Sequence, residues 1–234
     1  MASRANTDTQ DAAAYLAGSG WLASTTPEFA NAILDMVQWR RFGPGDSIIH
    51  AGDSNADLLG LAMGTAALTS SLGAADAPVA HIVTAPFWFG YAPLINRRSR
   101  ILSTTARSPV LVAQVRQGAV KQLLAENPGW WQHIAVLAQT STETALNIAT
   151  DLMIRSSRRR CAATLLRIAG CRFEDRPPPA IAWTNQEELG GIANMARSTL
   201  NLILGDLEGD GFISRGYNQI ILHDTAALRV IADG

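Results

Sequence analysis

The stretch TNQEELGGIANMARSTLNLILGDLEGDGFI, residues 184–213, decides the fold of the C-terminal part of the chain. Thr184 and Glu187 have the spacing of a capping box, in which the threonine caps a helix and the glutamate reaches back to the cap. Asn194 tolerates a left-handed turn, and the helix expected after it, Ala196–Gly209, repeats apolar residues on one face. Two short helices joined by such a turn indicate a helix-turn-helix.

The residues that follow predict a β-hairpin. Strands at Phe212–Arg215 and Gln219–Leu222 flank the turn residues Gly216-Tyr217-Asn218. A hairpin placed directly after the second helix is the wing of a winged helix. An apolar helix at Cys161–Ile168 and a linker-like run at Arg176–Pro179 precede these elements.

The N-terminal half contains short apolar runs that are separated by Gly, Pro and Asp turns. Such spacing is typical of a small β-sandwich or barrel. Short helices are expected on either side, at Pro27–Val37 and Gln117–Glu126, the second of which ends before Pro128. The predicted strands are Val37–Phe42, Ser47–His50, Leu58–Met63, Ala66–Leu72, Val79–Thr84, Ile101–Ala106 and Val110–Val115.

A long helix is expected to connect the two halves. It starts at Pro128 and runs for about 28 residues, or ~40 Å. Its apolar and small residues follow a strict 3-4 spacing, which is the pattern of a coiled-coil seam and predicts a partner helix from a second copy of the chain. A helix packed on its own barrel is the alternative. The seam residues are Trp131, Ile134, Ala138, Ser141, Ala145, Ile148 and Leu152.

Composition limits the class of protein. The 234 residues carry a formal net charge of −1, which excludes a uniformly basic nucleic-acid coat. Cys161 and Cys171 are the only cysteines, and His50, His81 and His133 show no metal-ligand spacing, so no metal or other cofactor is expected. Without an apolar signal region or a membrane-length apolar run, the chain is expected to be cytoplasmic and to have no membrane partner.

In this order, the elements resemble those of the CRP/FNR family of bacterial transcription regulators. Arg41–Ile49 followed by Gly52-Asp53 looks like the family's first β-roll strands, and Phe89-Gly90 falls where its phosphate cassette begins. Thr184–Leu207 followed by Glu208–Ile213 is similar to its DNA-binding signature. The resemblance implies an α+β fold with three parts: a jelly-roll-like β-roll of the cyclic-nucleotide-binding type (1–127), a long dimerisation helix (128–157) and a winged helix-turn-helix (158–234).

The effector pocket departs from the family's cyclic-nucleotide pattern. The resemblance aligns Tyr91 with the ribose-binding glutamate, Arg100-Ile101-Leu102 with the phosphate-binding Arg-Ser/Thr-Ala, and Ala145-Leu146 with the purine-binding Thr-Ser. Only the arginine is kept. Because unpaired polar groups of a buried ligand cost about 1–3 kcal/mol each, we expect no binding of cyclic AMP and leave the effector unknown. The pocket candidates are Phe89, Gly90, Tyr91, Arg100, Ala145 and Leu146.

Aromatic residues crowd the same place. Phe87-Trp88-Phe89-Gly90-Tyr91 contains four aromatic side chains. They could line an apolar ligand pocket or fill the cavity, and filling is favoured because stacked aromatics in a β-roll usually build core.

The resemblance makes Ala196–Gly209 the recognition helix and Arg197 its guanine-reading residue, with Ser198, Thr199 and Asn201 beside it. The family's base-contacting glutamate is missing, and Leu202 stands where a second arginine is usual, so a different sequence preference is expected. Residues 151–234 contain ten Arg and ten Asp or Glu, which weakens the expected attraction to phosphates. Arg158–Arg160 are expected to form a solvated helix face, with a phosphate or interdomain contact as the alternative.

The sequence therefore predicts a homodimeric, non-enzymatic transcription regulator that binds a two-fold symmetric DNA site. RNA polymerase and an unidentified small molecule are its further candidate partners. Two alternatives stay open. One is a metal-dependent β-barrel enzyme of the cupin type, and the other is a family member that acts through protein contacts without binding DNA.

Overall fold

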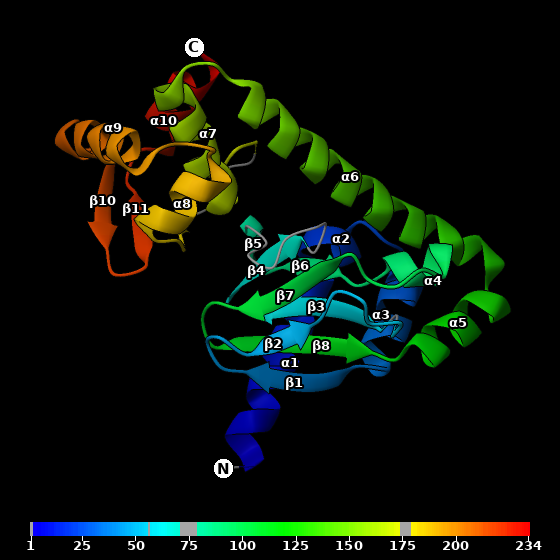
Figure 1. Ribbon diagram of the computed structural model, residues 1–234. Helices are drawn as coiled ribbons and strands as arrows, with labels where there is room; N and C mark the ends of the chain where they lie inside the picture. The colour runs from blue at the N-terminus through cyan, green and yellow to red at the C-terminus, as the bar shows by residue number, and fades with distance from the viewer. Residues whose placement is uncertain (1, 56, 71–78, 174–178) are drawn as a thin grey trace. The chain divides into compact units, whose positions relative to one another are not determined.

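The computed structural model describes residues 2–55, 57–70, 79–173 and 179–234 (Figure 1). The predicted linker at 176–179 and the end of the strand predicted at 66–72 lie mostly outside the described residues. The chain divides into two compact units: one comprises Met1–Ala66, Ser70–Gly73 and Thr84–Glu143, and the other comprises Ala67–Thr69, Ala74–Val83 and Thr144–Gly234.

Two four-stranded sheets form the β-roll, with strand orders β1-β8-β3-β6 and β2-β7-β4-β5 (Figure 1). In the first sheet, β3 pairs antiparallel with both β8 and β6. Gly64, between β3 and β4, has φ +84°, and a Cβ there would lie 2.4 Å from the Pro109 carbonyl, so this turn requires glycine. The strands are β1 (Gln38–Phe42), β2 (Ser47–Ile49), β3 (Leu58–Met63), β4 (Thr65–Ser70), β5 (Val79–Thr84), β6 (Phe87–Phe89), β7 (Leu102–Ala106) and β8 (Val110–Val115).

Helices cover one face of the first sheet. Their apolar side chains pack with those of β3, β6 and β8 in one core, in which Phe29 and Ile33 are fully buried. The α3 helix begins where the Thr26 side chain accepts a hydrogen bond from the backbone of Phe29 and Pro27 fixes the first helical position. The helices are α1 (Ala2–Gly18), α2 (Gly20–Ala23), α3 (Pro27–Asp35), α4 (Ala92–Asn96) and α5 (Gln117–Glu126).

The long helix α6 spans Trp131–Met153 and has 23 residues, fewer than the expected 28. Pro128–Trp130 form a separate 3-10 turn, η1, before it. The helix ends because the next helix, α7 (Ser157–Ile168), has its own cap: the Ser156 side chain accepts a hydrogen bond from the backbone of Arg159. The prediction of one continuous helix from Pro128 to residue 157 is therefore wrong at both ends.

The remaining elements build a winged helix-turn-helix around one apolar core. Helix α7 is buried from Cys161 to Ala169 and packs with the apolar faces of α8, α9 and α10. A three-stranded antiparallel sheet of order β10-β11-β9 completes the unit, and Tyr217 and Asn218 form the two-residue turn of the wing. The elements are β9 (Ala180–Ala182), α8 (Gln186–Ile192), α9 (Arg197–Gly209), β10 (Ile213–Gly216), β11 (Gln219–Leu222) and α10 (Thr225–Asp233).

The cap of α8 differs from the predicted capping box by one residue. Asn185 is the N-cap, and its side chain accepts a hydrogen bond of 2.9 Å from the backbone of Glu188. Thr184 instead donates its hydroxyl to the Glu188 carboxylate at 3.3 Å. The helix is capped as expected, but by Asn185 in place of Thr184, and the Glu188 carboxylate accepts from the Thr184 hydroxyl.

Candidate functional site

The turn between α8 and α9 sets the start of the expected recognition helix. Asn194 has φ +47°, and the backbone of Met195 donates a hydrogen bond of 2.9 Å to the Gly190 carbonyl. A Cβ on Gly190 would lie 3.1 Å from the Met195 carbonyl, so glycine permits this close turn. Ala196 then serves as the N-cap of α9 and Arg197 is its first residue.

Helix α9 has a buried and an exposed face, as its sequence pattern predicts. Arg197, Ser198 and Asn201 are exposed, whereas Thr199 is half-buried. Three of the four predicted DNA-contacting side chains are thus open to solvent on the first turns of α9, and the fourth is partly covered. The buried face consists of Leu200, Ile203, Leu204 and Leu207.

Arg197 is available for a ligand. Among the described residues it has no hydrogen bond and no ion pair. It lines a hollow of about 360 Å³ between the start of α8, the start of α9 and the wing, and a second hollow of about 330 Å³ along the α8–α9 turn. A guanidinium group in this position can donate two parallel hydrogen bonds to one acceptor pair.

The acidic residues at the far end of α9 are paired with arginines of the same unit. Arg158 of α7 donates to Asp210 at 2.7 Å and lies 3.7 Å from Asp206. Arg215 of β10 donates to Glu208 through its backbone at 2.9 Å and through Nε at 2.8 Å. The side-chain hydrogen bonds from Arg215 hold the pKa of Glu208 below its usual range. These carboxylates therefore oppose DNA less than their number suggests.

The expectation that Arg158–Arg160 form a solvated face holds only in part, because the half-exposed side chains also contact the rest of the unit. Arg158 has the ion pairs given above, and Arg159 donates to the carbonyls of Ala232 and Asp233 at the end of α10. Arg160 donates to Ala193 at 2.8 Å and to Asn194 at 3.3 Å, the carbonyls that end α8. Because these contacts join α7 to α8, α9 and α10, the three arginines connect the helices of the helix-turn-helix while their side chains remain partly exposed.

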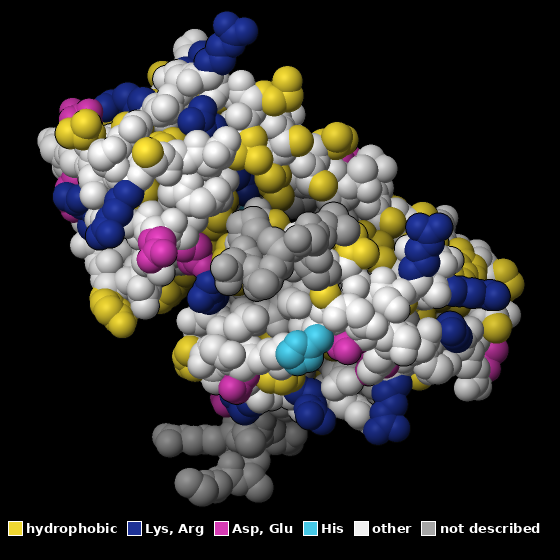
Figure 2. Space-filling model, viewed as in Figure 1, with side chains coloured by type: hydrophobic (Ala, Val, Ile, Leu, Met, Phe, Trp, Pro, Cys, Tyr) yellow, Lys and Arg dark blue, Asp and Glu magenta, His cyan; other side chains and the backbone are white. Residues whose placement is uncertain are grey.

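Basic groups do not merge into one surface on the face shown in Figure 2. There, Lys and Arg side chains occur singly or in small groups between neutral, apolar and acidic ones. This distribution agrees with the net charge of −1.

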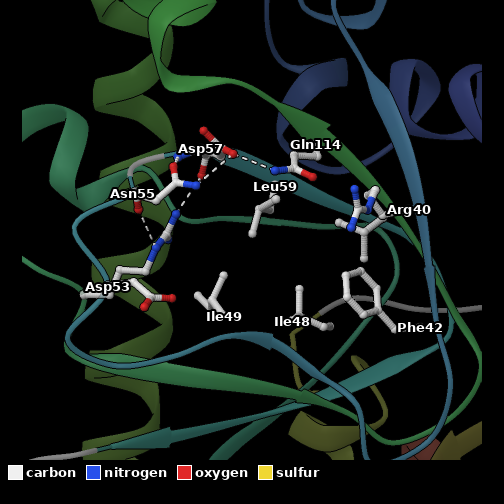
Figure 3. A pocket seen from close by; sticks show the side chains of 11 residues that line it. Arg40, Phe42, Ile48, Ile49, Asp53, Asn55, Asp57, Leu59 and Gln114 are labelled. Atoms are coloured by element: carbon white, nitrogen blue, oxygen red, sulfur yellow. Dashed lines mark hydrogen bonds between the residues drawn. The ribbon is translucent and has the colours of Figure 1, made fainter.

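A small cavity lies inside the β-roll (Figure 3). Its volume is about 100 Å³. Apolar side chains of Ile48, Ile49 and Leu59 form part of its wall, with the polar groups of Asp57, Asn55 and Gln114 along one side (Figure 3). The other lining residues are Arg40, Phe42, Asp53, Arg100 and Val112.

Arg100 is engaged by the protein itself. It is 7% exposed, and its guanidinium donates to the Asn55 carbonyl at 2.8 Å and to the Asp57 carbonyl at 3.0 Å. Burial lowers the pKa of Arg100, while Asp57 and Asp53 act in the opposite direction. The arginine that the family resemblance assigns to phosphate therefore already has acceptors.

Asp57 is the centre of a polar network that sequence reasoning missed. Its carboxylate accepts hydrogen bonds from the side chains of Gln114 at 2.6 Å and Asn55 at 3.1 Å, and from the backbone of Gln117 at 2.8 Å. The only sequence signal was Gln114, a polar residue inside the apolar strand 110–115.

The other pocket candidates do not line this cavity. Gly90, with φ +87°, lies against Arg100, since a Cβ on it would be 2.9 Å from Nη1 of that residue. Phe89 is buried and stacks on Phe87 with 6.0 Å between ring centroids. Tyr91 precedes α4 and packs against the helical core. Ala145 and Leu146, in the second unit, are exposed.

Trp88, in the middle of β6, points to the opposite face of the strand from Phe87 and Phe89. Its ring is 2% exposed and lies edge-on to Trp21 with centroids 5.3 Å apart, and a Cβ on Gly60 would be 2.9 Å from it. Trp88 is thus a core residue on the helical side of the sheet. It does not fill the β-roll cavity.

The predicted seam of α6 is partly buried in its own chain. Ile134 is fully buried with the core of the first unit, while Ala138, Ser141 and Ile148 are half-buried. The exposed seam residues are Trp131, Ala145 and Leu152.

Among the residues that the structure describes, no three His, Cys, Asp or Glu side chains come together as metal ligands. In the same part of the chain, no helix combines the length and apolarity needed to cross a bilayer. His81 contacts Nη1 of Arg167 through its Nδ1 at 3.1 Å, and His50 lies 3.4 Å from the Ser47 hydroxyl.

Comparisons with known proteins agree with both units. Residues 159–231 match the family model of the Crp-like helix-turn-helix domain, and residues 39–127 match that of the cyclic nucleotide-binding domain. A curated relative, the cAMP-dependent protein kinase regulatory subunit of Hypocrea atroviridis, is 33% identical over 108 residues, which are 46% of this chain and 22% of that protein. The chain therefore spans less than a quarter of the length of this relative.

Solved structures with similar folds include regulators from two bacteria. A CRP-family transcriptional regulator from Thermus thermophilus has a TM-score of 0.64 and 20% identity, covering 83% of this chain and 97% of its own. The c-di-GMP-responsive global regulator CLP of Xanthomonas campestris has a TM-score of 0.64 and 16% identity, covering 86% and 100%. At these identities the likeness shows the fold.

Proposed function

Because the chain belongs to the CRP/FNR family of transcription regulators, we propose that it is a homodimer that binds a two-fold symmetric DNA site through α9. Its effector, on this proposal, is not cyclic AMP. The cupin-type enzyme alternative has no support in a chain of this family, and we propose a non-enzymatic protein of the cytoplasm with RNA polymerase as a candidate partner.

One observation carries the DNA-binding proposal: the exposed start of α9 presents Arg197 with no partner in the described part of the chain. A recognition helix reads base edges with the residues of its N-terminal turns. Arg197, Ser198 and Asn201 lie there and are exposed, and the positive end of the helix dipole points the same way. This free arginine argues against a family member that acts through protein contacts alone.

The dimer proposal rests on the exposed side of α6. Trp131, Ala145, Leu146 and Leu152 are exposed, with Leu146 61% exposed and Leu152 38% exposed. The small side chain of Ala145 permits close approach of a partner helix at the middle of this side. A second copy would cover these apolar side chains and bring two α9 helices to one DNA site.

The proposal that cyclic AMP is not the effector rests on size and on hydrogen bonding. Ligand pockets usually measure roughly 300–1,000 Å³, whereas the β-roll cavity has about 100 Å³. Arg100 donates to two backbone carbonyls, and Tyr91, Ala145 and Leu146 replace the family's nucleotide-binding polar groups. Mass spectrometry of small molecules that copurify with the protein is the search for another effector.

A binding selection tests the main proposal. Random duplexes are selected with the full-length protein, and the enriched sequence is titrated by electrophoretic mobility shift at several salt concentrations. We expect a palindromic site and an affinity that falls with salt. Failure to enrich any sequence, together with no salt-dependent retardation, would overturn DNA binding in favour of protein contacts alone.

A further inference from the structure

Leu202 lies in the middle of the exposed face of α9, although it is apolar. Its side chain is 72% exposed, whereas Leu200 and Leu204 on either side in sequence are fully buried. The packing of α9 on its own unit is thus complete without Leu202. Among the leucine and isoleucine residues of α9, Leu202 alone is exposed, and its side chain is free to contact another molecule.

The neighbours of Leu202 on that face are small or short. Ser198 and Thr199 lie about one turn before it and Gly205 and Asp206 about one turn after it. Ser198, Leu202 and Gly205 share a stripe along the helix, and the carboxylate of Asp206 beside this stripe lies 3.7 Å from Arg158. A Cβ added to Gly205 would meet nothing within 4 Å. Because little side-chain volume surrounds Leu202, its isobutyl group protrudes and the helix backbone is able to approach a groove closely.

The edges of the bases determine what such a group can read. In the major groove, G, C and A present only hydrogen-bond donors and acceptors, and thymine adds a methyl group at C5. An isobutyl group has no donor or acceptor, so it would remove water from a polar edge without replacing its hydrogen bonds. Against a thymine methyl it buries apolar surface on both sides.

We propose that Leu202 selects a thymine in each half-site by contacting its C5-methyl group. The proposal rests on the function proposed above, in which α9 is the recognition helix. Leu202 follows Arg197 by five residues, or about 7.5 Å along the helix, which corresponds to about two base-pair steps. The thymine should therefore lie about two base pairs from the guanine that Arg197 reads.

The methyl group can be removed from the DNA without changing the protein. In the duplex selected by the full-length chain, each thymine is replaced in turn by deoxyuridine, which lacks only the methyl, and affinities are measured for three proteins. These are the wild type, Leu202→Ala and a control, Val230→Ala, whose side chain on α10 is also 72% exposed. Because both replaced side chains are exposed, both variants should unfold at the same temperature as the wild type.

The wild type should lose about fourfold in affinity when the contacted methyl is removed from one half-site, and about 15-fold when it is removed from both, from the free energy of burying one methyl group. Leu202→Ala should bind the intact site more weakly and be insensitive to deoxyuridine at that position. Val230→Ala should behave as the wild type, and Leu202→Met should retain the sensitivity.

The outcomes separate this inference from the proposed function. If the wild type selects no sequence, DNA reading by α9 fails and the inference fails with it. If the wild type selects a site but no deoxyuridine weakens its binding, or if Leu202→Ala keeps the same sensitivity, only the role of Leu202 is refuted. The deoxyuridine series on the wild type decides the matter even if a variant does not fold.

Discussion

Replacement of Arg197 by alanine tests whether this side chain is the principal base reader. Arg197 is exposed and unpaired within the described residues, so its loss should change the free energy of unfolding by less than about 0.5 kcal/mol. A bidentate contact to guanine contributes about 1–3 kcal/mol, and a dimer makes two of them. Two such contacts total about 2–6 kcal/mol, so affinity for the preferred palindrome should fall by at least about 30-fold and, at the upper end of this range, approach the affinity for random DNA.

Selection from random duplexes with wild type and variant, followed by titration at several salt concentrations, measures this loss. The dependence of non-specific binding on salt should stay nearly the same, because it counts phosphate contacts rather than base contacts. Arg155→Ala is the matched control, since Arg155 is also exposed and unpaired within the described residues. It should keep the sequence preference. A variant of Arg197 that recovers the same palindrome with undiminished preference would show that Ser198, Thr199 and Asn201 or DNA shape provide the specificity.

Three further predictions concern the effector, the dimer and acid stability. Calorimetry with cyclic AMP and cyclic GMP should show no saturable binding below about 100 μM, and a tighter constant would mean that other groups replace the missing ones. Ala145→Glu should dissociate the dimer in sedimentation experiments, because each copy would bury an unpaired carboxylate at a cost of about 3 kcal/mol or more. The control Thr140→Glu, on the other side of α6, should remain dimeric. Equal dimerisation of the two variants would refute the α6 interface. Burial and, as the smaller cause, the charge of Arg167 lower the pKa of His81 from 6.5 to about 3. Between pH 6.5 and pH 3 the unfolded chain therefore binds one proton more than the folded chain. As the pH decreases through this range, the free energy of unfolding should fall by about 1.4 kcal/mol per pH unit. Denaturant titrations of His81→Gln should lack this part of the slope, and an identical slope in the variant would contradict it.

The elements whose bounds were predicted best are those in which the pattern of apolar residues reflects packing against one core. The strands Leu58–Met63 and Val110–Val115 and the helix Gln117–Glu126 have the predicted bounds, because apolar runs between turn residues define them. Helix α1 was missed, since its polar sequence gives no clear periodicity. Strands β6 and β9 have three residues each, which is too short for a pattern.

The roles of the predicted DNA-contacting residues, which rest on the family resemblance, stay a prediction, and the contacts that were missed are long-range. The exposure of Arg197 follows from the helical periodicity of α9, so local sequence was enough. Asp57 meets Gln114 and Gln117 only because β3 pairs with β8, and no local pattern places residues 57 positions or more apart together. Two of the three partners of Arg160, Ala193 and Asn194, are likewise 33 and 34 residues away.

The arrangement of charge along α9 explains why the balanced composition of residues 151–234 is a poor guide to DNA binding. At the far end of the helix, Arg158 and Arg215 face Asp210 and Glu208. Such exposed pairs contribute little to stability, but they connect α9 to α7 and to the wing and so restrict its orientation. At the near end, Arg197 has no acidic partner in the described residues and adds its charge to the positive end of the helix dipole. The arginines at the far end therefore orient the helix, and Arg197 at its start is left free for the DNA contact proposed above, a division that a count of charges does not reveal.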